Sequence, residues 1–284
     1  MAQPEQLESM TQGIPMAQIV TWNVNSIRTR LDQVLQWLQA QTESGSPIDL
    51  LCLQETKVSD DQFPLAPFEE AGYQVAIFGQ KSYNGVALIS REPLQEVSLG
   101  FAPVLEDGVG DLDDQKRLIR GSLNGITIVN VYVPNGSEVG SDKYSYKLRW
   151  LLGLQHYLSA LFQQDPSLKL VLCGDYNIAP SDEDIYDAKK AGQIMASDLE
   201  RQALTQIAAL GLQDAFRKIN PDPGHYSWWD YRSGGFPRNR GWRIDHHFVS
   251  TALFPDVQDC QIDVEPRGAD KPSDHAPVIL TVGE

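Results

Sequence analysis

The sequence predicts a single α/β domain in which two packed β-sheets are covered on the outside by helices. Segments with strand character outnumber those with helix character, and several strands are continuous apolar runs of the kind buried on both faces. Strands of that kind need a layer on each side, and two sheets with helices outside provide it. The chain of 284 residues contains no repeat, low-complexity tract or linker, so we expect one folding unit.

The first part of the chain alternates between the periods of strand and helix. Ser26 is a candidate N-cap for a helix, because apolar residues recur after it at helical spacing. The run "IDLLCLQET" is almost continuously apolar, as in a strand covered on both faces. The elements expected here are a strand within 17–26 that ends in a polar loop, strands at 48–56, 73–79 and 85–90, and a helix at 26–41.

The second part of the chain begins with a hairpin pattern that turns at Asn124-Gly125, a strong turn signal. A long amphipathic helix and a buried strand follow, and Gly211 is a candidate C-cap for a second helix. The elements expected here are the hairpin at 118–133, helices at 142–163 and 198–210, and strands at 168–177, 243–250 and 276–282.

Composition excludes several classes of protein. No stretch approaches the run of about 18 apolar residues that a membrane helix needs. Residues 1–16 are polar and lack the basic start and apolar centre of a signal peptide, so we expect a flexible extension before a domain at 17–284. Cys52 and Cys173 lie in apolar strands, which predicts buried, reduced thiols in a cytoplasmic protein.

The charge of the chain is segregated. The net charge of −15 argues against a protein that coats nucleic acid over its whole surface, but it leaves room for a local basic surface. Between Arg217 and Arg243 there are six Lys or Arg residues against two acids. Between Ser181 and Glu200 six acids oppose two lysines, and we expect these acids to form a solvated face.

Polar side chains able to bind a metal or a phosphate recur where strands end or begin. They are Asn23 and Asn25, Glu55 and Lys57, Tyr132 and Asn135, Asp175 and Asn177, Asp245, Asp274 and His275. Each one alone has an ordinary explanation, since turns favour these residue types. Their recurrence favours a functional site instead, because α/β folds build sites at strand ends along one edge of a sheet.

The chemistry that this set supports is specific. Carboxylate and amide oxygens suit a hard cation such as Mg²⁺, which leaves coordination positions for water and phosphate. An acid beside His275 can orient the imidazole to move a proton or to stabilise developing charge. The sequence has no phosphate-binding Gly-Lys-Ser/Thr loop and no GxSxG motif. Metal-assisted attack of water on a phosphodiester is the reaction that remains.

Six segments, in this order, make the chain recognisable: "TWNVNSIR", "LCLQETK", "NVYVPNG", "GDYNIAP", "GWRIDH" and "SDHAPV". Together they resemble the exonuclease III family of abasic-site endonucleases, within the larger endonuclease/exonuclease/phosphatase group. The resemblance spans Ile19 to Leu280. It implies a four-layer α/β sandwich and a hydrolase of base excision repair that uses Mg²⁺, with Mn²⁺ able to substitute. The implied activity is cleavage of duplex DNA 5′ to abasic sites, leaving a 3′-hydroxyl, with 3′–5′ exonuclease and 3′-end-cleaning activity.

The resemblance also implies roles for individual residues. Asp175 is the acid that activates water, and Asn177 positions that water or the phosphate. Tyr132 supports the scissile phosphate, while His275, oriented by Asp245, contacts a phosphate oxygen. The sequence leaves open whether Asp175 or His275 is the general base, and we favour Asp175. The implied metal-binding residues are Asn23, Glu55, Asp175, Asn177, Asp274 and His275.

Substrate binding is implied for a further set of residues. Trp228 and Trp242 are expected to form an apolar pocket for the base-less sugar, whereas Trp150 and Trp229 are expected in the core. An extruded sugar costs least where no base is stacked, which would give selectivity for the lesion. The other implied substrate-binding residues are Lys57, Asn135, Arg232, Arg238 and Arg240. The expected partner is duplex DNA with abasic sites or 3′ ends, bound by a monomer that needs no membrane and no obligate protein partner.

Three positions depart from the family pattern. Asn25 stands where some relatives carry an aspartate, Ser137-Glu138 follows "VPNG" where some relatives place an arginine, and His246 is more polar than expected. Two alternative functions stay open. Another phosphoesterase of the same large group would use the same central residues. A catalytically silent relative that binds nucleic acid would have lost Glu55, Asp175 or His275, yet all three are present.

Overall fold

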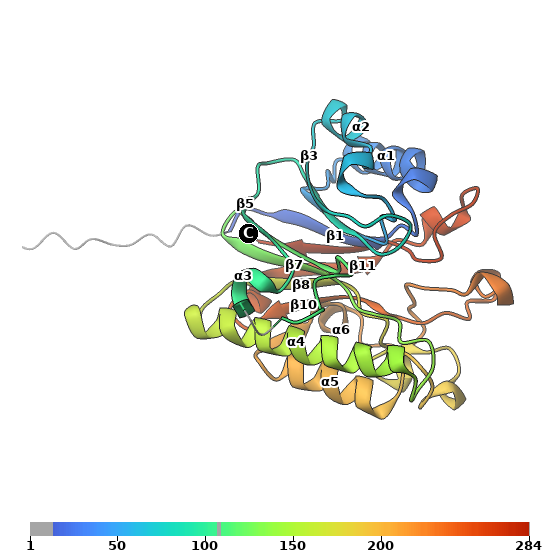
Figure 1. Ribbon diagram of the computed structural model, residues 1–284. Helices are drawn as coiled ribbons and strands as arrows, with labels where there is room; N and C mark the ends of the chain where they lie inside the picture. The colour runs from blue at the N-terminus through green and yellow to red at the C-terminus, as the bar shows by residue number, and fades with distance from the viewer. Residues whose placement is uncertain (1–13, 107–108, 284) are drawn as a thin grey trace, which may run out of the picture.

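The computed structural model describes residues 14–106 and 109–283, and within them two six-stranded mixed sheets pack face to face (Figure 1). The first sheet has the order β11 (Val257–Ile262), β12 (Val278–Val282), β1 (Ala17–Asn23), β2 (Leu50–Gln54), β4 (Val86–Ser90), β3 (Gln74–Phe78). The second has the order β5 (Gln95–Leu99), β6 (Leu118–Leu123), β7 (Ile126–Tyr132), β8 (Leu170–Asp175), β10 (Asp245–Ser250), β9 (Leu212–Asp214).

Helices cover the outer face of each sheet. Those over the first sheet are α1 (Ile27–Glu43) and α2 (Leu65–Glu70), and those over the second are α3 (Ala102–Leu105), α4 (Asp142–Gln164) and α5 (Asp198–Ala208). The short helix α6 (Ala215–Ile219) packs beside β10 and β11. The four layers are therefore helix, sheet, sheet and helix, as the sequence predicted (Figure 1).

Short 3₁₀ turns complete the described secondary structure. They are at Asp60–Gln62, Asp182–Asp184, Ala188–Lys190, Tyr231–Ser233, Phe236–Arg238, Phe254–Asp256 and Glu265–Gly268. No helix in the described part of the chain is both long and apolar enough to span a bilayer.

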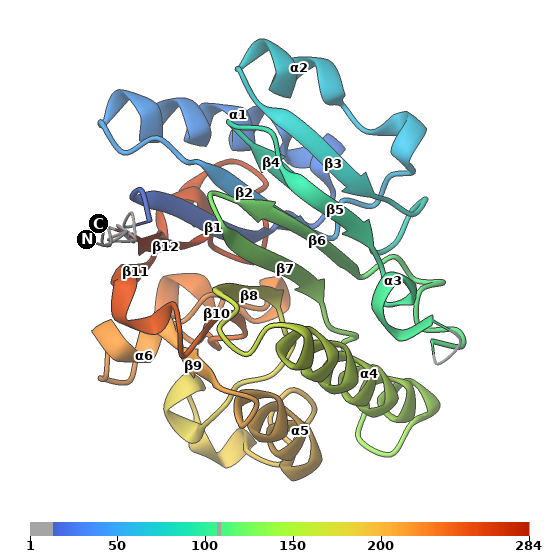
Figure 2. The ribbon, with the colours of Figure 1, turned by 90° about the vertical axis from the view of Figure 1, so that its left-hand side faces the viewer.

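Each sheet contains one parallel strand pair, and both pairs are built in the same way. Strands β1 and β2 are parallel and are joined through α1, and strands β7 and β8 are parallel and are joined through α4 (Figure 2). Parallel neighbours end at the same edge of a sheet, so the residues that follow them come together. Asn23 pairs with Gln54 at one such end, and Tyr132 pairs with Asp175 at the other.

A buried polar contact joins the two sheets just beneath these strand ends. Gln54 of β2 donates from Nε2 to Asn130 Oδ1 of β7 at 2.7 Å, and Asn130 donates back to the carbonyl of Leu53 at 3.0 Å. Both side chains are fully buried. Directional hydrogen bonds in an otherwise apolar layer fix one position of the sheets relative to each other. The residue after Gln54 is Glu55, so this contact sets where Glu55 lies.

Two expectations about where elements begin need correction. Ser26 does precede α1, but its side chain makes no capping hydrogen bond. The first amides of the helix are satisfied differently, because Ser26 N and Ile27 N donate to the carbonyls of Glu55 and Thr56 at 2.7 and 3.1 Å. The strand expected from Arg243 begins at Asp245, since Arg243 is held by ion pairs that are described below.

Only the end of the expected N-terminal extension lies within the described residues. Residues 1–13 lie outside the described part of the chain, so the expected flexibility of that stretch stays a prediction. Ile14, however, is 9% exposed and belongs to the core between the sheets. Ile14 is therefore packed, whereas the start of the domain at residue 17 stays a prediction.

The helix expected at 198–210, which is α5 in the structure, ends slightly earlier than predicted. Its last helical residue is Ala208 and its C-cap is Ala209, whereas Gly211 follows with a φ of 100°. The glycine thus supplies the left-handed turn into β9 rather than the cap itself. The three cysteines are free and buried, as expected for Cys52 and Cys173.

Candidate active site

Polar residues from four strand ends meet at one edge of the two sheets. Asn23 and Asp175 are the last residues of β1 and β8, and Tyr132 is the last residue of β7. Glu55 directly follows β2 and has a left-handed backbone, with a φ of 52°. Such a conformation is costly for a residue other than glycine and is found mainly where the surroundings enforce it.

One amide group holds both carboxylates. Asn23 Nδ2 donates to Glu55 Oε1 at 3.0 Å and to Asp175 Oδ2 at 2.9 Å. Glu55 also accepts from Tyr132 Oη at 2.7 Å and pairs with Lys57 Nζ at 2.8 Å. Burial raises the pKa of Glu55, but Lys57 and the hydrogen bonds from Asn23 and Tyr132 outweigh it, so the pKa lies below its usual value. Glu55 is therefore an ionised carboxylate at neutral pH.

Asp175 is held differently. It is 1% exposed, and its Oδ1 accepts a hydrogen bond from the backbone N–H of Asn177 at 2.8 Å. Burial, together with the nearby carboxylate of Asp245, raises the pKa of Asp175 to about 7, although His275 acts in the opposite direction. A carboxylate with a pKa near neutrality is suited to accept a proton from water.

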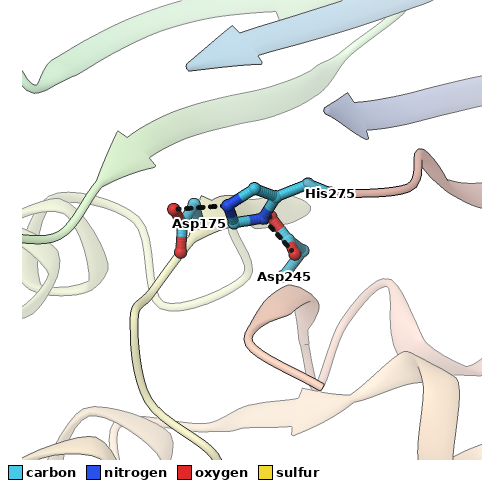
Figure 3. Close-up of side chains that lie close together, drawn as sticks. All are labelled: Asp175, Asp245 and His275. Atoms are coloured by element: carbon cyan, nitrogen blue, oxygen red, sulfur yellow. Dashed lines mark hydrogen bonds and ion pairs between the residues drawn. The ribbon is translucent and has the colours of Figure 1, made fainter. Parts of the chain in front are cut away.

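The third component is a histidine between two acids (Figure 3). His275 Nδ1 lies 2.9 Å from Asp245 Oδ2, and its Nε2 lies 3.8 Å from Asp175 Oδ2. Burial alone would lower the pKa of His275, but the carboxylates of Asp245 and Asp175 raise it to about 10. At neutral pH the ring is therefore an imidazolium, with Nδ1–H donated to Asp245 and Nε2–H directed toward Asp175.

Ser227 supports this pair and was missed from the sequence. Its hydroxyl donates to Asp245 Oδ2 at 2.6 Å and accepts from the amides of Ile244 and Asp245 at 3.1 Å. The backbone of Ser227 also binds the amide of Ala276, next to His275. Its position directly before Trp228, one of the two tryptophans expected in the pocket, was the available signal.

Replacing Ser227 by alanine is expected to lower kcat about tenfold, because Asp245 loses a hydrogen bond to a charged group and orients the imidazolium less well. Steady-state cleavage of a substrate duplex measures this effect. Ser250→Ala is the matched control, since Ser250 is also buried and accepts a backbone N–H, from Leu170 at 3.0 Å, elsewhere on β10. Equal losses in both variants would show that Ser227 has no specific role.

Within the described residues, one group of three acidic or histidine side chains has ligand atoms all within 4.8 Å of one another, and it consists of Asp175, Asp245 and His275. Glu55 stands beside this group through the shared amide of Asn23. Asn177 points its Oδ1 to Asn135 Nδ2 at 3.0 Å, so these two expected site residues contact each other.

Asp274 is tied to the site by a chain of hydrogen bonds. Its Oδ1 accepts from Asn25 Nδ2 and its Oδ2 from Trp228 Nε1, both at 3.0 Å. Lys57 Nζ in turn donates to Asn25 Oδ1 at 2.5 Å. Asn25 thus bridges Lys57 and Asp274 through an amide that both donates and accepts, which an aspartate at this position could not do.

The two tryptophans of the expected pocket lie next to each other and to the catalytic loop. The backbone of Trp228 forms isolated antiparallel β-bridges with Trp242 and with His275. Trp228 is half-buried, but Trp242 is 5% exposed and packs into an apolar cluster with Ile185 and Met195. Only Trp228 therefore offers substantial surface in this state. Trp150 and Trp229 are buried in the core, as expected.

The charged runs divide into surface and interior. Arg232, Arg238 and Arg240 are exposed on the segment after Trp229. Arg243, in contrast, is 1% exposed and pairs with Asp184 and Asp214 at 2.7 and 2.8 Å. The basic surface is thus smaller than the sequence count suggested.

The expected solvated acidic face is wrong at two positions. Asp184 and Glu200 are 1% and 0% exposed, because each meets a buried cation. Burial raises the pKa of Asp184, but Arg243 and Arg217 outweigh it and bring the pKa to about 2. His246 belongs to the same cluster, since its Nδ1 lies 3.1 Å from Arg243 and its Nε2 2.9 Å from the carbonyl of Ile178. That explains a polar residue at a buried strand position.

Two packed sheets that place the ionised Glu55, the buried Asp175 and a carboxylate-bound imidazolium at one edge define a hydrolase of the nuclease and phosphatase type. The chain belongs to the Endonuclease/Exonuclease/phosphatase family, whose model matches residues 20–275, and within it to the exonuclease III group of abasic-site endonucleases.

Individual relatives agree. The chain is 37% identical over 272 residues to exodeoxyribonuclease III of Haemophilus influenzae, covering 91% of this chain and 97% of that protein. It is similar to the structure of an AP endonuclease from Archaeoglobus fulgidus, with a TM-score of 0.85, 40% identity, and 94% and 99% of the two chains covered. A 3′ phosphatase from Neisseria, solved with a product DNA hairpin, gives a TM-score of 0.85 at 39% identity, with 94% and 99% coverage.

Proposed function

We propose that this protein is a Mg²⁺-dependent nuclease of base excision repair that hydrolyses duplex DNA 5′ to abasic sites and leaves a 3′-hydroxyl. Trimming and cleaning of 3′ ends by the same site belong to the proposal. The observation that carries it is the juxtaposition of Asp175 with His275 and, through Asn23, with Glu55. The relatives that support it are named as exodeoxyribonuclease, AP endonuclease and 3′ phosphatase.

The donor set fits a hard divalent cation. Glu55 is ionised and partly exposed, and it shares the Asn23 amide with Asp175, so two carboxylates face one space. We assign the cation to Glu55 and Asp175, with Asn23, Asn177 and Asp274 around it, and Mn²⁺ as a substitute. His275, which lies with Asp175 and Asp245 in one group of possible ligands, is the further residue expected around the cation. When bound, the cation would act as a Lewis acid on phosphate oxygens.

The side chains then divide the remaining work. Asp175 accepts a proton from the attacking water, and the amide of Asn177 keeps its carboxylate in place. His275 donates Nε2–H to a phosphate oxygen and stabilises the charge that develops there, while Asp245 fixes the ring. Tyr132, whose hydroxyl donates to Glu55, would support the phosphate beside it.

DNA would be held by groups around this edge. Lys57, Asn135 and the exposed arginines Arg232, Arg238 and Arg240 would contact phosphates, which gives affinity without sequence preference. We expect a monomer without an obligate protein partner. The free, buried cysteines are typical of a reducing compartment and support a cytoplasmic location.

Replacing Trp228 by alanine is expected to reduce cleavage at an abasic site about tenfold and exonuclease activity much less. The half-buried indole would contact the base-less sugar, and burying an apolar side chain in such a contact contributes about 1.5–3 kcal/mol. Comparison of both activities in one variant provides its own control. Equal losses would contradict the pocket assignment for Trp228 and Trp242.

A labelled duplex with one tetrahydrofuran abasic analogue tests the proposed function. It is incubated with Mg²⁺, with Mn²⁺ and with EDTA, beside an intact duplex and a blunt-ended duplex. The expected result is a single metal-dependent cut at the analogue. A ladder from the 3′ ends without a preferred cut would reduce the proposal to a general 3′ exonuclease, and no cleavage with either metal would overturn it.

A further inference from the structure

A fully buried lysine lies beneath two loops of the candidate site. Lys147 belongs to α4 and is 0% exposed. Its ammonium donates to the carbonyl of Asn177 at 2.7 Å, to the carbonyl of Asn135 at 3.3 Å and to the carboxylate of Glu200. Each of the three ammonium hydrogens therefore has its own acceptor, which is the condition for keeping such a charge inside a protein.

Glu200 is equally committed. Besides Lys147 it accepts from the amides of Met195 and Ser197 at 3.1 and 3.0 Å and from the hydroxyl of Ser197 at 2.6 Å. The carboxylate is 0% exposed. It neutralises the lysine and orients its ammonium, so that the other two hydrogens point at the loop carbonyls.

The two carbonyls belong to the loops that follow β7 and β8. Their residues contact each other through Asn135 Nδ2 and Asn177 Oδ1 at 3.0 Å. Asn177 also donates from its amide to Asp175 Oδ1 at 2.8 Å, and from Nδ2 to the carbonyl of Val133 at 3.0 Å. Asn177 has a φ of 48°, and in this conformation its backbone N–H meets Asp175 while its carbonyl meets Lys147.

The loop after β7 is shaped around the lysine stem. A Cβ on Gly136 would lie 3.1 Å from Lys147 Cδ and 3.0 Å from Ile194 Cδ1, and Gly136 has a φ of 87°. A side chain at Gly136 would crowd the lysine stem, and its positive φ is strained for any residue other than glycine. Both partners thus contribute to this contact: Lys147 of α4 supplies the ammonium, and Gly136 lets the loop come close to the lysine stem.

We infer that Lys147, oriented by Glu200, is a positioning residue that holds the Asn135 and Asn177 loops in the conformation in which Asn177 supports Asp175. This inference rests on the proposed function for the readout of turnover. It adds to that function a residue one layer below the site. It also assigns a purpose to Glu200, an acid that was expected on a solvated face.

A purely structural role for Lys147 would be to join α4 to the start of α5. A second buried hydrogen bond also joins these two segments, so the two roles can be separated. Tyr144, one turn before Lys147, has its hydroxyl 2.7 Å from Ser197 Oγ. Tyr144→Phe therefore weakens the same pair of helices without touching either loop carbonyl. It is the matched control.

The test compares wild type, Tyr144→Phe and the double variant Lys147→Met with Glu200→Gln, which removes both charges together. Cleavage of the tetrahydrofuran duplex is measured at saturating Mg²⁺, well below each melting temperature. We expect kcat to fall about tenfold or more in the double variant with KM within about threefold, and no change in kcat for Tyr144→Phe. Lys147→Leu with Glu200→Gln serves in its place if the first pair does not fold.

Hydrogen exchange gives a second readout that does not depend on turnover. In the double variant, the peptides that contain Asn135 and Asn177 are expected to exchange faster, while those of α4 and α5 stay protected. Unchanged kcat and unchanged exchange in the two loops, in a variant that is only less stable, would overturn the inference. If wild type itself does not cut the duplex, the proposed function fails instead, and loop exchange alone then decides whether Lys147 positions the loops.

Discussion

Asp175→Asn is expected to lower kcat on an abasic duplex by about 10³-fold or more while the protein stays folded. The asparagine keeps the size of the side chain and can accept the amide of Asn177, but it cannot take a proton from water. Its NH₂ group also faces the Asn23 amide, which now donates to Asp175 Oδ2 at 2.9 Å, so a modest loss of stability is expected as well.

The measurement is single-turnover cleavage at saturating Mg²⁺, with thermal unfolding recorded in parallel. Asp49→Asn is a suitable control, because Asp49 also accepts an N–H, from Gln18 at 2.8 Å, but lies at the opposite end of β2 from Glu55. Near-normal turnover in Asp175→Asn would rule out Asp175 as the general base and leave His275 as the candidate.

His275→Gln is expected to lower kcat by about 10²- to 10³-fold, because the imidazolium that faces the phosphate is lost. Asp245→Asn should show a similar loss, and the double variant should be no slower than the slower single variant. Residues that act as one unit show this lack of additivity. His247→Gln is the matched control. His247 is also a buried histidine, but it lies on β10 and its ring nitrogen is 3.0 Å from the carbonyl of Val278.

The pH profile gives an independent check on the same pair. Because the acids raise the pKa of His275 to about 10, the wild-type ring keeps its proton through neutral pH and loses it as the pH approaches that value. Turnover should therefore decline on the alkaline side, and this decline should disappear in His275→Gln.

The double variant of His275→Gln with Asp245→Asn tests whether the two residues act as one unit. Losses in it that equal the product of the single losses would show that His275 and Asp245 act separately.

Much of the fold could be predicted from local patterns. The apolar runs at 48–56 and 168–177 became β2 and β8, and Asn124-Gly125 became the turn between β6 and β7. The period of a strand or helix and the chemistry of a turn are local properties, so neighbouring residues suffice to read them. Polar residues that follow such strands could be assigned to one edge of the sheets for the same reason.

The state of each polar group could not be predicted in that way. Glu200 and Asp184 belong to an acidic run, yet both are buried because Lys147 and Arg243 reach them from other elements. Sequence patterns did not single out Ser227, because its partner Asp245 is brought to it only by the fold. A charge is stabilised by the partners around it in space, and these partners are distant in sequence.

The sequence by itself therefore determined the α/β architecture, the family and the set of polar residues at the strand ends. Only the tertiary structure decided that one amide, that of Asn23, holds Glu55 and Asp175 together, that His275 stands between two acids, and that Trp242 is largely covered. The physical reason is that residue type and spacing fix backbone conformation locally, whereas burial and the proximity of charges depend on how distant segments pack.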